Sequence, residues 1–437
     1  MGGQAGAGNT HRALIRFRAR RLNLRREAKK AFNRNWQPYT RSYRSCLGDE
    51  RRFRRLEAML KGLLIAQTPK IQRLAAKWCP NVKPASAAKA GYRLLANPHL
   101  SADTLLAPLA HRARSLCVNR KQVLGIIDLS SIEKPYARKM EGLCRVRRND
   151  ASGTTNGYEL LTILFRADRD VGLAAYRLFS HQAEAMSQNW EIESKMSEVR
   201  ERLPAKTKVI WVWDRGFDDR KNYQRVLSWR DGFVGRVYHN RRVTVGGRLR
   251  SLLSWGRGLR LRGQFSMRLS YRGRRRRVRI GLSWGRFRFE GHWLWLLRAQ
   301  ILWVEGLLLD HVEDREWWLM TDQALHGRSD AITVWGYYRQ RWEIENFFKF
   351  LKEGFELEDF QVMKLEEIRR ITALVAIVAM FIYQLSGSIG DEPARLLYQL
   401  GGWTGRGKPG KAALQRGLAS FLNYLAVGRL LSLGGFT

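Results

Sequence analysis

KVIWVWDRGFDD, residues 208–219, is the stretch that decides the fold. Its apolar run of β-branched and aromatic side chains predicts a buried strand, and Asp214 follows at the carboxyl end of that strand. The earlier run VLGIID, residues 123–128, repeats the pattern and predicts a strand that ends at Asp128. Two strands therefore deliver one aspartate each to their carboxyl ends.

The segments around these runs predict a mixed α/β chain. NGYELLTILFRAD (156–168), VGLAAYRLFS (171–180) and REWWLMTD (315–322) are typical of strands, and EIESKMSEVRERL (191–203) is typical of a helix. Residues 10–110 predict mostly helices. The chain has 437 residues, 45% of them hydrophobic, which suggests two or three domains and excludes general disorder.

The charge of the chain is strongly unbalanced. It contains 79 Lys and Arg against 39 Asp and Glu, a formal net charge of +40. Self-repulsion on this scale disfavours a compact state unless a polyanion neutralises it, and a phosphate backbone does so with release of counterions. Nucleic acid is the expected partner, and a basic protein of a membrane surface or of the ribosome is the alternative.

One segment concentrates this charge. Residues 236–289 hold seventeen arginines and no carboxylate, in short segments that alternate with glycine-bearing turns. This pattern predicts an inserted antiparallel β subdomain with one cationic face, and its densest run is Arg274, Arg275, Arg276 and Arg277. A solvated sheet face is the plain interpretation, but uncompensated arginines repel one another, which favours DNA binding.

Several segments exclude other classes of protein. The apolar run ITALVAIVAMFIYQL (371–385) has fifteen residues where a membrane helix needs about twenty, which predicts a buried core helix. The first residues contain no apolar core of signal-peptide length before their arginines. The cysteines form no CxxC pair, so neither a zinc knuckle nor a disulfide framework is indicated; they are Cys46, Cys79, Cys117 and Cys144.

A second functional pattern lies in SDAITVWGYYRQRWEIENFFKFLKEGF (329–355), which predicts a long helix capped by Ser329 or Asp330. Intervals of three, four and seven residues return to nearly the same side of a helix. One face therefore carries Tyr338, Arg341, Glu345 and Lys352.

The plain interpretation of this face is a solvated stripe whose Arg341–Glu345 pair contributes only about 0.2–0.5 kcal/mol. If the helix instead packs across the sheet edge, Glu345 joins Asp128 and Asp214 in an acidic pocket inside a very basic protein. Glu343 points about 200° away from Glu345 on a helix and is the weaker candidate.

Three close carboxylates repel one another unless a cation neutralises them. Their hard oxygens suit Mg²⁺ or Mn²⁺, which keep waters and take further ligands from substrate phosphates. Two such ions, about 3.5–4 Å apart, would activate the attacking oxygen and stabilise the leaving one. This chemistry is phosphoryl transfer on a nucleic acid backbone.

The motifs IIDLSS and WDRGFD, followed by Tyr338-x2-Arg341-x3-Glu345-x6-Lys352, resemble the DDE transposases of bacterial insertion sequences, in the subgroup with the Tyr-Arg-Glu-Lys signature. The resemblance covers about residues 47–415. It implies a ribonuclease H-like, retroviral-integrase-like catalytic core with a β-rich insertion between the second and third acidic residues.

The same resemblance implies roles for single residues. Asp128, Asp214 and Glu345 would be the catalytic residues and the ligands of two Mg²⁺ or Mn²⁺ ions per active site. Phosphates and terminal bases of the transposon end would be contacted by Tyr338, Arg341 and Lys352. Trp317 matches the indole onto which related enzymes flip a base, with Trp318 one residue off, although a core tryptophan is the plain interpretation. Asp218 and Asp219 more plausibly cap the following helix than bind metal.

The expected organisation has three parts. Residues 1–110 would form a basic helical DNA-binding region, and residues 111–395 the catalytic domain, with its Arg-rich insertion at about 236–312. Residues 396–437 would form a helical dimerisation segment whose apolar stripe could equally fold back on its own core. The expected partners are double-stranded DNA, as terminal inverted repeats and target, and a second copy of the chain, in the bacterial cytoplasm at the nucleoid and without a membrane.

Three functions compete. A DDE transposase of the cut-and-paste type uses all the motifs above. A catalytically silent DNA-binding relative would be expected to lack a carboxylate, and all three are present. A structure-specific nuclease would share the metal pocket but would not need the Tyr, Arg and Lys positions or the Arg-rich insertion.

Overall fold

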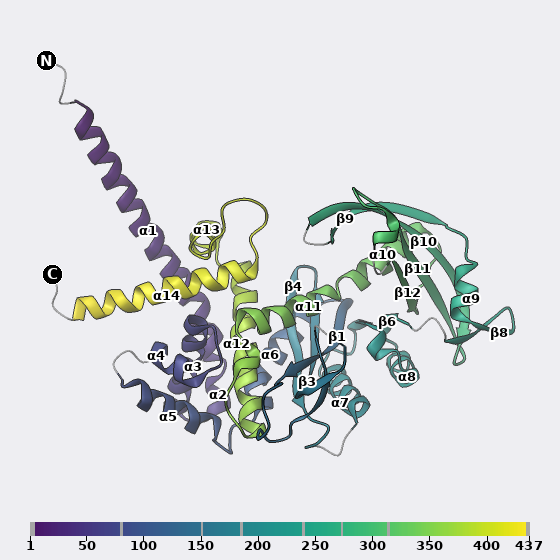
Figure 1. Cartoon of the computed structure of the whole chain (residues 1–437), viewed down its shortest axis with the longest axis horizontal. Coiled ribbons are helices and arrows are strands. Elements are labelled where there is room, and N and C mark those ends of the chain that lie inside the picture. Colours follow the sequence, from purple (N-terminus) through teal and green to yellow (C-terminus); the bar gives the residue numbers. More distant parts are fainter. Residues whose placement is uncertain are drawn as a thin grey trace.

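The computed structural model describes residues 5–78, 82–149, 152–183, 187–237, 241–271, 274–312 and 315–433. It describes the side chains of these residues outside 5–22, 270–271 and 427–433. Cys79 and Pro80 lie outside the described residues. The chain is a mixed α/β protein in which one large sheet is flanked by helices, with the amino-terminal helices on one side of Figure 1 and the Arg-rich strands on the other.

The amino-terminal third is helical, as predicted. Its helices are α1 (Ala5–Arg41), α2 (Arg44–Leu47), α3 (Glu50–Ala66), α4 (Ile71–Trp78), α5 (Pro84–Leu95) and α6 (Ala102–Cys117). The later helices are α7 (Gln188–Glu201), α8 (Arg220–Ser228), α9 (Leu252–Arg257), α10 (Arg328–Arg339), α11 (Trp342–Lys349), α12 (Leu365–Ser388), α13 (Asp391–Leu400) and α14 (Lys411–Leu433). Single turns are η1 (Arg215–Phe217), η2 (Leu309–His311), η3 (Phe350–Gly354) and η4 (Leu357–Asp359).

The strands join one mixed sheet in the order β2-β3-β1-β5-β6-β12-β11-β10-β7-β8, with β4 paired to β3 and β9 to β10. The pairs β1–β5 and β5–β6 are parallel, and the other pairs are antiparallel. The strands before the insertion are β1 (Gln122–Glu133), β2 (Cys144–Arg147), β3 (Thr154–Ala167), β4 (Asp170–Phe179), β5 (Lys208–Trp213) and β6 (Gly232–Arg236). The remaining strands are β7 (Arg242–Val245), β8 (Arg248–Ser251), β9 (Gly263–Tyr271), β10 (Arg274–Phe289), β11 (His292–Val304) and β12 (Glu316–Thr321).

The two aspartates lie level with each other on neighbouring parallel strands. The last register pair between β1 and β5 is Ile126 with Val212, and each aspartate comes two residues later. Asp214 directly follows the last residue of β5, as predicted. The prediction that the first strand ends at Asp128 is wrong: β1 continues to Glu133 because it still pairs with β3 there, and Asp128 pairs with Thr162.

The Arg-rich segment continues the core sheet. β10 and β11 pair along their length, and β12 connects β11 back to β6 (Figure 1). In the described part of the chain these strands are therefore an extension of one hydrogen-bonded sheet.

α12 is the central core helix, as predicted for the run 371–385, which is almost entirely buried. With 24 residues it is the one helix among the described residues that is long and apolar enough to cross a membrane, but 78% of its apolar window is buried inside the chain. It packs between α3, α6 and β4 (Figure 1), and Tyr39 Oη donates to the carbonyl oxygen of Ile377 (2.6 Å). Burial of each large apolar side chain here contributes about 1.5–3 kcal/mol.

The stripe of α14 packs against its own chain. Leu418, Phe421 and Leu422 are buried, and α14 contacts α3, α12 and α13. Leu425 is half-buried, and the side chain of Leu430 lies outside the described residues. The described part of this stripe therefore takes the alternative arrangement of folding back on its own core.

Candidate active site

The guanidinium of Arg341 joins the three candidate carboxylates. Its Nη1 lies 3.2 Å from Asp128 Oδ2, and its Nη2 lies 2.6 Å from Glu345 Oε1 and 3.9 Å from Asp214 Oδ2. The three predicted acidic residues, from β1, from the end of β5 and from α11, therefore surround one cation. These three side chains are called the carboxylate cluster below.

Burial shapes the electrostatics of this cluster. The side chain of Arg341 is 6% exposed, whereas those of Asp128 and Glu345 are 18% and 49% exposed. Burial raises the pKa of Asp128 to about 7, Asp214 and Glu345 act in the same direction, and Arg341 opposes the shift. Burial also disfavours the charge on Arg341, but Tyr338 and the carboxylates outweigh it and raise the pKa of the guanidinium above its ordinary value.

The helix that carries the signature is interrupted, contrary to the prediction. α10 ends at Arg339 and α11 begins at Trp342, with a turn at Gln340 and Arg341 between them. Both turn residues keep helical torsions (φ −70°, ψ −13° and φ −56°, ψ −32°), so residues three and four apart remain on one face. This near-helical turn keeps Tyr338, Arg341 and Glu345 together.

The cap of α10 also differs from the prediction. Gly327 is the N-cap residue, and Asp330 lies three residues later. Asp330 Oδ2 accepts hydrogen bonds from the amides of Gly327 and His326 (3.0 Å each). Ser329 lies inside the first turn, where its carbonyl oxygen accepts from Thr333 Oγ1 (3.0 Å).

The other two signature residues lie in different surroundings. Tyr338 is buried, its Oη donates to Asp214 Oδ1 (3.4 Å), and burial raises its pKa to about 12. Lys352 falls in η3, a π-type turn whose wider spacing rotates it away from the Arg341 face. Its Nζ donates to the carbonyl oxygen of Ser131 (2.6 Å) and lies 3.3 Å from Glu358 Oε1.

Two residues of this neighbourhood were missed from the sequence. Glu358, in η4, accepts from the amide of Glu133 (2.9 Å) as well as pairing with Lys352. Arg236, at the end of β6, has its Nη1 4.0 Å from Asp214 Oδ1. The sequence shows that Arg236 ends a strand. Its place beside Asp214 follows only from the order of the strands, because β6 pairs with β5.

The competing acidic residues lie elsewhere, as predicted. Glu343 pairs with Arg166 (3.1 Å) and Lys411 (3.3 Å), away from the cluster. Asp219 caps α8 through the amide of Lys221 (2.7 Å). Asp218 does not cap a helix, because its buried carboxylate binds Tyr223 and Arg241.

The two tryptophans of β12 point to opposite faces of the sheet. Trp317 is 8% exposed and packs against Trp335 of α10, with ring centroids 4.9 Å apart. Trp318 is buried on the other face against Gly256 of α9 and carries Arg298 over its ring (5.1 Å). In this arrangement the Trp317 indole is part of the core.

The run of four arginines lies at the start of β10. Arg274, Arg275 and Arg277 are exposed, whereas Arg276 is half-buried and its Nη1 donates to the carbonyl oxygen of Glu305 (2.8 Å). Three of the four predicted DNA contacts are therefore open to a ligand.

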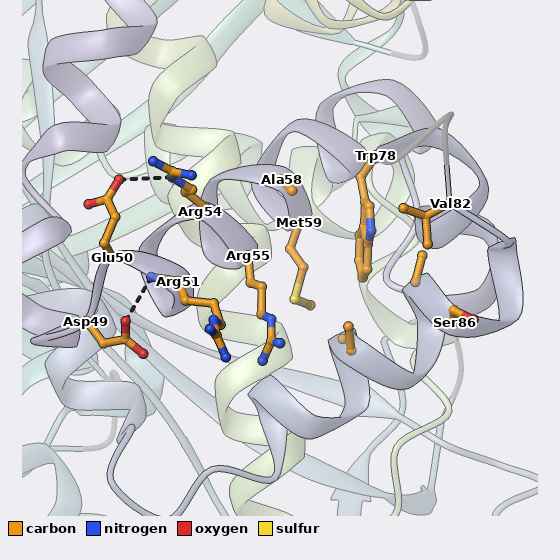
Figure 2. Close-up of a pocket in the computed structure, with 13 residues that line it drawn as sticks. Asp49, Glu50, Arg51, Arg54, Arg55, Ala58, Met59, Trp78, Val82 and Ser86 are labelled. Atoms are coloured by element: carbon orange, nitrogen blue, oxygen red, sulfur yellow. Dashed lines mark hydrogen bonds and ion pairs between the residues drawn. The ribbon is translucent and has the colours of Figure 1, made fainter.

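A cavity of about 600 Å³ lies between α3 and α5 in the amino-terminal region. Figure 2 shows the guanidinium groups of Arg51 and Arg55 side by side at its edge, with Met59 and Trp78 along its wall. A Cβ on Gly91 would lie 2.6 Å from Trp78 Cη2, so this glycine lets the indole pack closely. The cavity combines two cations with an apolar wall.

The donor set of the carboxylate cluster fits a hard divalent cation, because its three carboxylates converge on one positive charge, with Arg236 at 4.0 Å from Asp214 as a second cation. In the present arrangement that charge is Arg341, and no group of three or more His, Cys, Asp or Glu among the described residues is placed to share a metal ion. Arg341 Nε is buried without a hydrogen-bond partner, so this guanidinium is not fully satisfied where it lies. A divalent ion therefore fits the donors only if Arg341 moves.

A comparison with protein families matches the part of the chain that carries two of the three carboxylates. Residues 195–381 match the family model described as the transposase DDE domain, a range that includes Asp214, Glu345 and the Arg-rich insertion and leaves Asp128 outside. The match indicates a transposase, and hence an enzyme that acts on DNA. The matched part of the chain is similar to the DDE domain of transposases, a family that generally uses divalent metal ions.

Proposed function

We propose that the protein is a cut-and-paste DNA transposase of the subgroup with the Tyr-Arg-Glu-Lys signature, similar to the transposase of the composite kanamycin-resistance transposon. Its catalytic core would be ribonuclease H-like, and Asp128, Asp214 and Glu345 would be the catalytic carboxylates. The observation that carries this proposal is the convergence of these three residues, 217 residues apart in the chain at the extremes, on one guanidinium.

The cluster would hold two Mg²⁺ or Mn²⁺ ions, which supply a polarised phosphoryl oxygen and an activated hydroxyl at neutral pH. Arg341, displaced from the carboxylates, would pair with phosphate oxygens, for which its planar fork is suited. Tyr338 would hold Asp214 in place through its hydroxyl. Lys352, fixed by Glu358 and the Ser131 carbonyl, would keep a positive charge next to β1.

Double-stranded DNA would be bound by several basic surfaces. The exposed arginines of β10 would contact phosphates, and the Arg51–Arg55 cavity would take part in recognition of the transposon end by residues 1–110. Catalysis would fall to residues 111–395, with the insertion at about 236–312. A dimer formed on DNA would require a contact other than the buried stripe of α14, although residues 396–437 contain further surface.

The test is a reaction of purified protein with duplexes that carry the inverted repeats flanking its gene, in the presence of Mg²⁺ and a target plasmid. We expect double-strand breaks at both repeat ends and joining of the released 3′ ends to the target. Cleavage without joining would favour the structure-specific nuclease, and specific binding without cleavage would favour the silent relative.

A further inference from the structure

A second cavity, of about 480 Å³, lies where the core meets the Arg-rich extension of the sheet. Four arginines line it: Arg215 and Arg236 from the core, Arg257 from α9 and Arg315 just before β12. We call it the arginine cavity. It lies on the α9 side of β12 with Trp318, on the opposite face of the strand from Trp317.

The lining of this cavity holds more positive than negative charge, with four arginines and one carboxylate. The one carboxylate in its lining is Glu316, and Glu316 Oε1 is already bound by Arg298 Nη2 (2.6 Å). Arg315 pairs at 3.5 Å with Asp310, whose side chain is 94% exposed, and such surface pairs contribute little. Within the described part of the chain, no carboxylate pairs with Arg215 or Arg257.

Positive charge held in a concave site concentrates the field there, and an anion relieves the repulsion between the guanidinium groups. Guanidinium groups bind phosphate oxygens through two parallel hydrogen bonds, so several of them around one cavity suit a phosphate. The apolar part of the lining, which includes Leu253 and Ile301, suits the sugar beside it. The volume is within the range of small-ligand sites, about 300–1,000 Å³.

The position of the cavity ties it to the carboxylate cluster. Arg215 directly follows Asp214 in the chain, and Arg236 lies between Asp214 Oδ1 (4.0 Å) and the carbonyl oxygen of Glu316 (3.5 Å). We propose that the arginine cavity binds a backbone phosphate of the DNA strand that is cut, close to the scissile phosphate. This proposal rests on the proposed function, because it takes DNA to be the substrate at Asp214.

The arrangement has a mechanical result. Two of the four arginines belong to the core and two to the extension, so one bound phosphate would bridge them. Strand binding would then add to the pairing of β12 with β6, which already joins the extension to the core next to Asp214.

The first experiment is ethylation interference on a duplex that carries one terminal repeat, with wild-type protein and with the double variant Arg257→Ala, Arg315→Ala. Both side chains are exposed, so the variant is expected to fold. We expect wild-type binding to be blocked by ethylation of one phosphate next to the cleavage site, and the variant to lose that signal. The matched control is Arg169→Ala, Arg230→Ala, which removes two exposed arginines outside the cavity lining and should retain it. An unchanged pattern in the cavity variant would overturn the proposal.

A second measurement does not depend on transposase activity. Phenylglyoxal modifies accessible arginines, and peptide mass spectrometry locates the modified residues. We expect inorganic pyrophosphate to protect Arg257 and Arg315 at concentrations that leave Arg169 and Arg230 reactive. Equal protection of both pairs, or protection of neither, would refute the cavity as an anion site even if the wild-type protein cleaves transposon ends. Selective protection in a protein that cleaves no DNA would leave the anion site standing and refute the proposed function.

Discussion

The carboxylate cluster, which includes Asp214, and the arginine cavity, which Arg215 lines, have opposite imbalances of charge. In the cluster three carboxylates converge on the guanidinium of Arg341, whereas the lining of the cavity holds four arginines and one carboxylate, Glu316, which Arg298 already binds. Each site therefore lacks the ion that the other has in excess. In the proposed function, a DNA strand with its divalent ions would supply both, since the metal would balance the carboxylates and the phosphates would balance the arginines.

The largest expected effect is in the cluster. Asp128→Asn, Asp214→Asn and Glu345→Gln each remove one negative charge with little change of shape. Each should lower the rate of strand cleavage by about 100-fold or more while leaving binding of transposon ends close to wild type. Single-turnover cleavage and gel shift measure the two effects.

Glu343→Gln is the control for that series, because Glu343 pairs with Arg166 and Lys411 outside the cluster. Its cleavage rate should stay near wild type. If Glu343→Gln abolishes cleavage and Glu345→Gln does not, the assignment of the third carboxylate is wrong.

The next effect concerns the cation of the cluster. Arg341→Met should raise the affinity of the free protein for Mn²⁺ by about 10-fold, a change of about 1.4 kcal/mol, because it removes the guanidinium that competes for the same oxygens. The same variant should cleave DNA more slowly. Electron paramagnetic resonance of free Mn²⁺ measures the affinity, with Arg339→Met as the control, since Arg339 lies over Trp342 and not among the carboxylates. Equal Mn²⁺ affinity in wild type and Arg341→Met would show that Arg341 does not compete with metal.

A smaller effect is expected from the exposed arginines of β10. Each phosphate contact adds about 0.9 to the slope of log affinity against log salt on duplex DNA. Replacing Arg274, Arg275 and Arg277 by alanine should therefore flatten the slope by up to about 2.7. Arg276 is left in place because it holds the Glu305 carbonyl. A slope identical to that of wild type would place this face in solvent.

The smallest expected effect is on how the free energy of unfolding depends on pH in the absence of metal. The pKa of Asp128 in the folded chain is raised to about 7, above its ordinary value of about 3.9, so folding favours the protonated form. That contribution is complete at acid pH and is lost as pH rises from about 4 through 7. Relative to Asp128→Asn, wild type should lose about 1–3 kcal/mol of unfolding free energy over this window. Urea denaturation at pH 4 to 8 measures the free energy of unfolding of both proteins. If it changes with pH equally in wild type and in Asp128→Asn, Arg341 keeps Asp128 ionised.

The sequence was sufficient to predict the strand and the helix that position Asp214 and Glu345. Asp214 follows an apolar strand, and Glu345 lies on an amphipathic helix, because local patterns of burial determine both. It was not sufficient for the extension of β1 past Asp128, which depends on pairing with β3. The π-type turn that redirects Lys352 and the packing of the α14 stripe are also set by distant contacts. The arginine cavity could not be predicted from the sequence, because its lining comes from six separate stretches of chain.

The path of α12 has a consequence for how the protein is made. The amino-terminal helices pack against α12, which comes much later in the chain. Tyr39 donates a hydrogen bond to the carbonyl oxygen of Ile377, and Arg370 donates one to the carbonyl oxygen of Leu95. Synthesis runs from the amino terminus, so the early helices are made before the helix against which they pack, since Ile377 follows Tyr39 by 338 residues. Glu345 also emerges 131 residues after Asp214. A chain released before residue 345 would lack the third carboxylate and the core helix together, so an incomplete product would have neither the carboxylate cluster nor the complete packing of its amino-terminal helices.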